Sequence, residues 1–363
     1  MIPDRPWKDL DWRLLLLALA ISALGVVQIY SATIGTKWES AWWKQTLFVA
    51  AGLGVMYLAS RVDYHVLLDH VPALYGICAL ALLGVLLLGR QVFGSRRWIP
   101  LPGGFTLQVS EFAKIIIILL IARYLSELKS GRPGLADVLK LGGFVAVPAA
   151  LVLKQPDLGT SLTYVAIAGA GLFFAGLRWR HWALILALAA VVVAASPLFL
   201  TEYQKARIES FRNPASDPLG SGYQVLQSMI AVGSGGIWGK GATQGSQTQL
   251  RFLPVPHTDF VLSAFAEEHG FAGVTLILGL YFLLLMQIVQ IAQAAPDRAG
   301  MYVCMGVGAL LLFQLFVNVG MLVGRMVVTG LPLPLMSYGG SSVLTTFLML
   351  GLVSNVRFQR FVN

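Results

Sequence analysis

The amino-acid sequence predicts an all-α polytopic membrane protein with ten transmembrane helices. Of its 363 residues, 57% are hydrophobic and only 12% are charged, whereas about 25% of the residues of a soluble domain are charged. The hydrophobic residues fall in runs of about 20, the length that a helix needs to cross a bilayer. The net charge of +9 comes from basic residues scattered between these runs. This scatter is typical of membrane proteins and not of proteins that bind nucleic acid.

Ten apolar runs are long enough to span a bilayer. We predict helices over residues 13–33, 42–60, 71–89, 110–128, 136–153, 158–177, 180–200, 259–292, 299–323 and 337–356. We expect the first run to be retained as a helix, because no small-residue cleavage site suits a signal peptide there. The long connection between the seventh and eighth helices, residues 201–258, is predicted to be a large extracytoplasmic loop with a short helix over 223–232. We predict one membrane domain, residues 1–363.

The distribution of Lys and Arg predicts the orientation of the chain. Thirteen of them lie on the side that holds both termini, and seven lie in the short loops of the other side. Because short cytoplasmic loops are enriched in Lys and Arg, both termini are predicted to be cytoplasmic.

This orientation brings four polar motifs to the outer face, since every even-numbered helix begins there. The motifs are QVSE at 108–111, KQPD at 154–157, HTD at 257–259 and SYGGSS at 337–342. Chance would scatter such motifs over both faces. The sequence therefore predicts a single site that faces outward.

Asp259 stands where the proline-stiffened segment 254–258 runs into the eighth apolar run. Aspartate is favoured in the first turn of any helix, where it complements the helix dipole. Alternatively, a half-buried carboxylate that faces a cavity is suited to act as a general base. The preceding His257 is interpreted as a hydrogen-bonding residue and not as a metal ligand, because no second histidine stands at metal-binding spacing.

Glu111 and Lys114 are spaced to form an ion pair in the first turn of the fourth helix, with Ser110 as a candidate N-cap. The pair is either a self-neutralised helix end or part of the site. The second interpretation is favoured because Lys114 lies inside an apolar run, where an ammonium group is costly. Asp157 follows Pro156, so it is either a helix N-terminal residue or a site carboxylate.

Arg96, Arg97 and Arg325 have two interpretations each, as interfacial anchors or as phosphate contacts. Lys240 ends the glycine-rich segment 233–241, which lacks the spacing of a nucleotide-binding phosphate loop. A flexible substrate-side loop or a tight packing turn is expected there.

The two cysteines, Cys78 and Cys304, lie inside apolar runs. A disulfide or a cysteine-based metal site is therefore not expected.

Several long motifs resemble those of the SEDS family (shape, elongation, division, sporulation), in the same order and over nearly the whole chain. They are QVSEFAK at 108–114, KQPDLGTSL at 154–162, GSQTQLRFLPVPHTDFVLSAFAEEHGFAG at 245–273 and GLPLPLMSYGGSS at 330–342. The form of the second and third motifs is more similar to the elongation members than to the division members. Val109 replaces a usual proline, and Val255-Pro256 replaces a usual acidic residue.

The resemblance implies a peptidoglycan glycosyltransferase that polymerises lipid II into glycan strands at the outer face of the cytoplasmic (inner) membrane. It implies that Asp259 is catalytic and that Glu111, Lys114 and Asp157 line a central cavity. It also implies a class B penicillin-binding protein, a transpeptidase, as the partner.

As a mechanism we expect Asp259 to act as general base and undecaprenyl pyrophosphate to leave. The developing negative charge needs cations. The candidates for substrate contacts are Arg96, Arg97, Lys114, Lys240, Arg325 and Ser337. No metal site is assigned, and the sequence neither requires nor excludes a divalent cation.

Two other function classes compete with the enzyme. A lipid II flippase would also have many spans and intramembrane charges, but it needs a polar route through both faces. A non-catalytic scaffold of the elongation machinery would leave Lys114 and Asp259 without a reason to be charged.

Overall fold

The protein is described here by a computed structural model. The structure describes residues 11–92, 95–100, 106–128, 131–195, 198, 205, 208–211 and 220–359. Nearly all described secondary structure is helical, as the sequence predicts.

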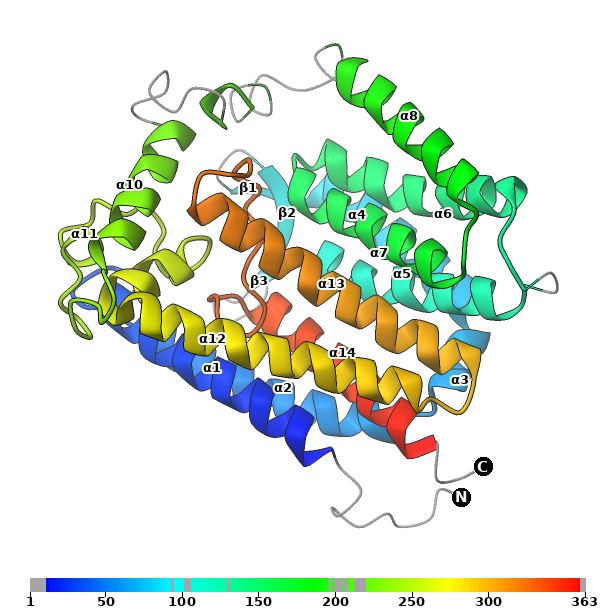
Figure 1. Cartoon of the computed structure of the whole chain (residues 1–363), viewed down its shortest axis with the longest axis horizontal. Coiled ribbons are helices and arrows are strands. Elements are labelled where there is room, and N and C mark those ends of the chain that lie inside the picture. The colour runs from blue at the N-terminus through cyan, green and yellow to red at the C-terminus, as the bar shows by residue number, and fades with distance from the viewer. Residues whose placement is uncertain are drawn as a thin grey trace.

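Each of the ten apolar runs forms a helix, and most of these helices run side by side as an elongated bundle with α8 at its edge (Figure 1). Their bounds are α1 Trp12–Thr33, α2 Ala41–Arg61, α4 Val71–Leu88, α5 Val109–Ser126, α6 Leu135–Lys154, α7 Leu158–Phe174, α8 Trp179–Ala195, α12 Val261–Gln293, α13 Arg298–Leu322 and α14 Gly340–Gln359. Among the described helices, α1, α6, α12, α13 and α14 are long and apolar enough to cross a membrane, and α4, α7 and α8 are shorter apolar helices.

Among the described residues, the connections include short helices and a small sheet. The helices are α3 Tyr64–Asp69, α10 Ser221–Ser234 and α11 Ser246–Gln249. The expected short helix over 223–232 is thus confirmed as α10. The strands β1 Arg90–Val92, β2 Ser95–Pro100 and β3 Thr106–Leu107 form an antiparallel sheet in the order β1-β2-β3. The all-α prediction is wrong at this sheet, because strands this short carry too few residues to show an alternating pattern.

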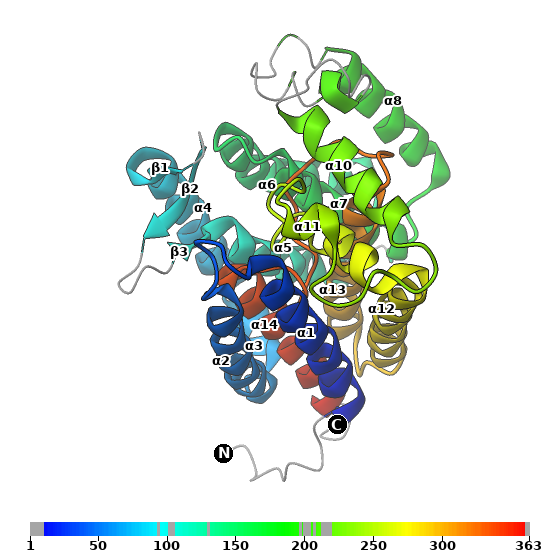
Figure 2. The same ribbon diagram turned by 90° about the vertical axis from the view of Figure 1, so that its left-hand side faces the viewer.

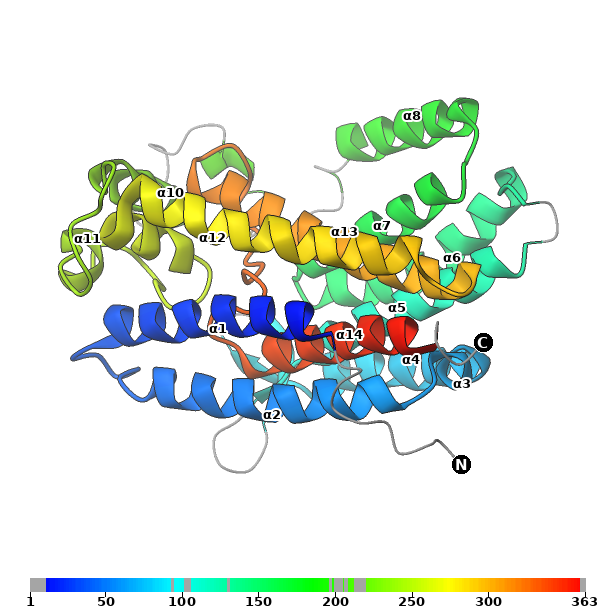
Figure 3. The ribbon, with the colours of Figure 1, turned by 60° about the horizontal axis from the view of Figure 1, so that its bottom comes forward.

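The bundle has two distinct ends (Figures 1 and 3). The loop end holds the sheet, α10, α11 and the connection between α13 and α14. The terminal end holds α3, the α12–α13 turn, the start of α1 and the end of α14. At the terminal end the buried Asp11 accepts a hydrogen bond from Gln287 Nε2 (2.7 Å) and pairs with Arg357. This contact fixes three helix ends together.

Small residues allow the helices to approach closely. A Cβ atom on Gly351 of α14 would lie 2.6 Å from the Met56 carbonyl oxygen of α2, and one on Gly306 of α13 would lie 2.9 Å from Ile118 of α5. Close packing of small residues is the main attraction between helices in lipid, where the hydrophobic effect gives little. Cys78 and Cys304 are buried and unbonded, as expected.

Candidate functional site at the loop end

Four polar segments meet at the loop end of the bundle, which Figure 2 shows facing the viewer. They are the segments that begin α5 and α7, the loop before α12 and the connection that leads into α14. These are the segments that carry the four motifs. The structure therefore brings together residues that are distant in sequence, such as Gln108 and Ser341, which lie 233 positions apart.

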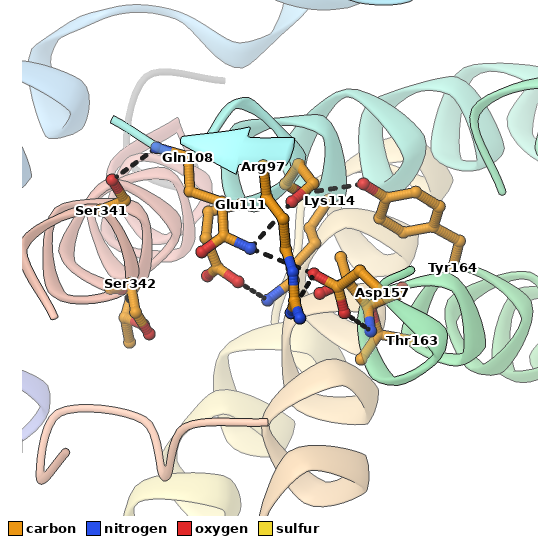
Figure 4. Close-up of polar contacts among 12 residues, drawn as sticks. Arg97, Gln108, Glu111, Lys114, Asp157, Thr163, Tyr164, Ser341 and Ser342 are labelled. Carbon is orange, nitrogen blue, oxygen red and sulfur yellow. Dashed lines mark hydrogen bonds and ion pairs between the residues drawn. The ribbon is translucent and has the colours of Figure 1, made fainter. Parts of the chain in front are cut away.

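Asp157 is the N-cap of α7 and is almost fully buried. One carboxylate oxygen, Oδ1, accepts the backbone N–H of Thr160 (3.1 Å). The other, Oδ2, accepts Gln108 Nε2 (3.2 Å) and pairs with Arg97 Nη1 (3.4 Å). Helix capping thus uses one oxygen, and side chains from β2 and from the start of α5 use the other (Figure 4). The helix N-terminal interpretation of Asp157 is confirmed for Oδ1, and the site interpretation stays a prediction.

Gln108 links three elements at this point. Its backbone N–H donates to Ser341 Oγ of α14 (3.0 Å), and its side chain also donates to Ser110 Oγ (3.1 Å). The expected N-cap role of Ser110 is wrong. Helix α5 already begins at Val109, so Ser110 lies inside the first turn and its hydroxyl accepts a side chain.

Glu111 and Lys114 form an ion pair of 2.6 Å within α5. Their side chains are only 5% and 1% exposed, and Figure 4 shows them beside Gln108 and Asp157. A buried ion pair contributes little net stability, because its desolvation cost offsets its Coulomb attraction. Self-neutralisation is therefore observed, but it does not explain why the two charges are buried here.

Asp259 lies in the loop before α12, which begins only at Val261 with Phe260 as its N-cap. The helix-dipole interpretation is therefore wrong, because the residue is outside the first turn. Asp259 is half-buried, and its carbonyl oxygen accepts Asn318 Nδ2 of α13 (3.2 Å). Its Oδ2 lies 3.6 Å from the position of a Cβ atom on Gly330, whose φ of +71° favours glycine. The carboxylate thus lies against the backbone of the α13–α14 connection.

The loop that carries Asp259 is bonded to this connection. Ser337 Oγ donates to the Thr258 carbonyl (2.7 Å) and accepts the backbone N–H of Leu333 (2.8 Å). The backbone N–H of Tyr338 donates to the His257 carbonyl (2.9 Å). Ser337 therefore holds the Asp259 loop in place, a role that the sequence prediction of a substrate contact did not include.

His257 is buried beside the rings of Trp38 and Tyr338, at centroid distances of 5.1 and 5.9 Å. Burial lowers the pKa of His257 to about 4, so the imidazole is neutral at pH 7. In the part of the chain that the structure describes, no group of three or more His, Cys, Asp or Glu side chains could hold a metal ion.

Helix α12 is interrupted at Gly270, and the loop 236–241 fills the break. Gly270 has a φ of +66°, so the next two N–H groups leave the helical pattern. On one side of the break, the N–H groups of Phe271 and Ala272 donate to the loop carbonyls of Gly236 and Ile237 (2.9 and 3.0 Å). On the other side, the carbonyls of Glu267 and Glu268 accept the loop N–H groups of Lys240 and Gly241 (3.0 Å each). The loop replaces two intrahelical hydrogen bonds with four external ones. The glycine-rich segment is thus a packing turn, one of the two expected alternatives.

The side chain of Glu267 holds this loop. Lys240 Nζ and the Gln247 N–H donate to Oε1 (2.8 Å each), and the N–H and hydroxyl of Thr248 donate to Oε2 (3.1 and 3.0 Å). Glu268 accepts Ser31 Oγ and Gln28 Nε2 of α1. Both glutamates have structural roles. The ammonium group of Lys240 is engaged by Glu267, apart from the Asp157 group.

The remaining candidate cations have different surroundings. Arg96 belongs to strand β2, and its side chain lies outside the described residues. Arg325 is exposed in the α13–α14 connection. The structure therefore brings Arg97, Glu111, Lys114 and Asp157 into one group.

Sequence reasoning missed the neutral amides of the site: Gln45, Gln108 and Asn318. Gln45 donates to the Ser337 carbonyl (3.0 Å) and accepts the Gly339 N–H (3.2 Å). The available signal was an amide inside an apolar run, since such side chains usually hydrogen-bond across helices.

An apolar helix bundle with a buried, charged group of side chains where four polar segments meet is an integral membrane protein with a candidate polar site at that end. The family model of FtsW, RodA and SpoVE, described as cell cycle protein, matches residues 11–361. The chain belongs to this family, which confirms the resemblance to the SEDS proteins.

The named relatives share a single activity. The chain is 38% identical over 362 residues to the peptidoglycan glycosyltransferase MrdB of Escherichia coli K12, covering 97% of this chain and 94% of that protein. It is 32% identical over 428 residues to the peptidoglycan glycosyltransferase RodA of Treponema pallidum, covering 97% and 98%.

Two solved structures share the fold. A chain from a peptidoglycan synthase complex, described as coordinating polymerization and crosslinking, matches with a TM-score of 0.83 and 37% identity, over 98% of this chain and all of that one. The rod shape determining protein RodA of Thermus thermophilus matches with a TM-score of 0.73 and 32% identity, over 98% and 99%.

Proposed function

We propose that this peptidoglycan glycosyltransferase polymerises lipid II at the loop end of its helix bundle, with Asp259 as the general base. The enzyme class is that of relatives 32–38% identical over nearly the whole chain. One observation carries the assignment of the site: Asp259, Asp157 and the buried Glu111–Lys114 pair all stand where the four polar segments meet. Buried charges at a common place in a membrane protein point to function.

In the proposed reaction, Asp259 accepts the proton of the 4-hydroxyl of the acceptor N-acetylglucosamine. The oxygen attacks the anomeric carbon of the donor N-acetylmuramic acid as the bond to the lipid pyrophosphate breaks, with inversion. The leaving pyrophosphate is already anionic, so it needs no general acid. In this proposal Lys114 and Arg97 stabilise its charge, as fixed cations do in low-dielectric sites.

We further propose that all ten helices span the membrane as one domain, residues 1–363, with the loop end outside and both termini cytoplasmic. The excess of Lys and Arg in the segments of the terminal end supports this orientation. The large extracytoplasmic loop is then residues 201–258. Within this loop, Lys240, Gln247 and Thr248 donate hydrogen bonds to Glu267 of α12.

A class B penicillin-binding protein is the proposed partner during cell elongation. The support is the likeness to a chain of a synthase complex that coordinates polymerization and crosslinking. The partner would receive the glycan strand at the same face of the membrane.

Incubating the purified protein and its transpeptidase with lipid II in detergent tests the proposal. Glycan polymer that depends on Asp259 supports it. Lipid II inversion in vesicles without polymer would instead indicate the flippase, and neither activity would indicate the scaffold. The placement of the candidate site residues Arg97, Glu111, Lys114 and Asp157 at one end favours the enzyme, because a flippase needs a polar route through the whole bundle.

A further inference from the structure

We propose that Asn318 is a positioning residue for Asp259. Its side-chain amide ties the loop that carries Asp259 to the α13–α14 connection, and so fixes the carboxylate relative to the substrate. The inference rests on the proposed catalytic role of Asp259.

Asn318 lies one turn before the end of α13 and is 0% exposed. Its Nδ2 donates two hydrogen bonds, to the carbonyl oxygens of Asp259 (3.2 Å) and Leu331 (3.1 Å). Both partners can only accept, so the side chain must present its NH₂ group to them. Among the twenty side chains few can bridge two carbonyls from one atom, and an amide does so without adding charge.

The two bonded carbonyls belong to the segments that form the surroundings of the Asp259 carboxylate. Leu331 follows Gly330, against which Asp259 Oδ2 lies. Asn318 therefore fixes both the aspartate and the backbone that its carboxylate faces. Because Asp259 precedes α12, regular helical hydrogen bonds do not hold its own peptide group. A brace from another helix supplies the rigidity that a general base needs.

The same segment reaches the second acidic group of the site. A Cβ atom on Gly159, two residues after Asp157, would lie 2.9 Å from the Thr329 carbonyl oxygen and 2.8 Å from Leu331. Residues 329–331 thus run from Asp259 to the start of α7. Asn318 Oδ1 and Thr329 Oγ1 are buried and accept or donate no hydrogen bond within the described part of the chain. Asn318 holds the junction at which these two carboxylates are placed relative to each other.

The test compares Asn318→Leu, which keeps the volume but removes the donor, with Asn318→Gln, which keeps the NH₂ group. Asn355→Leu is the matched control. Asn355 is also buried on a helix and bridges backbone groups, the Ser60 carbonyl (2.8 Å) and the Tyr64 N–H (3.0 Å), but at the terminal end. For each variant, kcat and KM for lipid II are measured with the partner transpeptidase, together with the midpoint of thermal unfolding in detergent.

We expect Asn318→Leu to lower kcat by about 10- to 100-fold with KM changed less than about threefold, since a displacement of about 1 Å can cost that much in rate. Asn318→Gln should recover part of the loss, and Asn355→Leu should lower the unfolding midpoint but not kcat of the folded protein. If Asn318→Leu and Asn355→Leu have the same unfolding midpoint and lose the same factor in kcat, the proposal is overturned. The loss of kcat would then follow from the lower stability and not from the position of Asn318.

Two further measurements keep the outcomes distinct. If Asn318→Leu does not fold, Asn318→Ser replaces it in the test. The serine side chain is too short to bridge both carbonyls. A wild-type kcat in Asn318→Ser would overturn the proposal. Asp259→Asn is measured in parallel. If it polymerises normally, the role of Asp259 itself fails, whereas an inactive Asp259→Asn with a fully active Asn318→Leu refutes only the positioning role.

Discussion

Replacing Lys114 with methionine, alone and together with Glu111→Gln, tests whether the Glu111–Lys114 ion pair serves stability or activity. The Lys114 ammonium lies 2.6 Å from Glu111 Oε1, and the two side chains are 1% and 5% exposed. Methionine fills nearly the same volume but leaves the Glu111 carboxylate buried without its cation. Removing one partner of a buried pair costs about 3–5 kcal/mol, so the unfolding midpoint in detergent should fall markedly.

The double variant Lys114→Met/Glu111→Gln tests the interpretation. Without either charge, the desolvation cost disappears, and most of the lost stability should return. Polymerisation of lipid II should stay at least about 100-fold below wild type, because a fixed cation in such a site contributes that much to the rate. Glu127→Gln is the control on the same helix. Its exposed pair with Arg123 is worth about 0–1 kcal/mol, so stability and activity should barely change.

A double variant that is as stable and as active as wild type would refute this reasoning. The pair would then be a structural feature of α5, and pyrophosphate binding would have to use other cations. The assay is gel analysis of glycan polymer from purified enzyme, partner and lipid II, normalised to the folded fraction.

Three further predictions concern the surroundings of the site. Gly270→Ala should lower the free energy of unfolding by at least about 3 kcal/mol in detergent denaturation, because φ is +66° and a Cβ atom would lie 2.6 Å from the Ile237 carbonyl oxygen. Gly279→Ala in the same helix is the control. Because nothing lies within 4 Å of its Cβ position, this variant should be neutral or stabilising by up to about 1 kcal/mol. Burial lowers the pKa of His257 to about 4, so as the pH falls the unfolded chain binds a proton there at a higher pH than the folded protein does. The contribution of His257 to stability is therefore full above about pH 6.5 and declines towards pH 4 by at most about 3 kcal/mol. His257→Gln should flatten that part of the profile of stability against pH, and an unchanged profile would contradict the lowered pKa of His257. Lys240→Met should leave the buried Glu267 without its cation and speed proteolysis within residues 240–250 at least tenfold, whereas unchanged cleavage would show that this ion pair does not hold the loop.

The sequence was sufficient for the helices because their signal is long. All ten apolar runs form helices, with ends within a few residues of those predicted, since a run of about 20 apolar residues has few other structures open to it in a membrane. The common location of the four motifs also followed from counting helices, because alternate helix starts share one face.

The contacts of the site could not be predicted in the same way. Gln45 and Asn318 bridge backbone groups that are distant from them in sequence, and Gln108 contacts the side chains of Asp157 and Ser341. No local pattern encodes such partners. The break at Gly270 was hidden because helical residues continue on both sides of it. Lys240 was one of the candidate cations for the leaving pyrophosphate, and its ion pair with Glu267, 27 residues on, could not be foreseen from the local sequence.

The polymerisation rate of Asp259→Asn protein tests the central claim most directly. Asparagine keeps the size of the side chain and the backbone contact with Asn318, but it cannot accept a proton at neutral pH. The purified variant, with its partner transpeptidase, should make at least about 10³-fold less glycan polymer from lipid II than wild type, at an unchanged unfolding midpoint and with unchanged partner binding. Wild-type polymerisation by the folded Asp259→Asn variant would contradict the account.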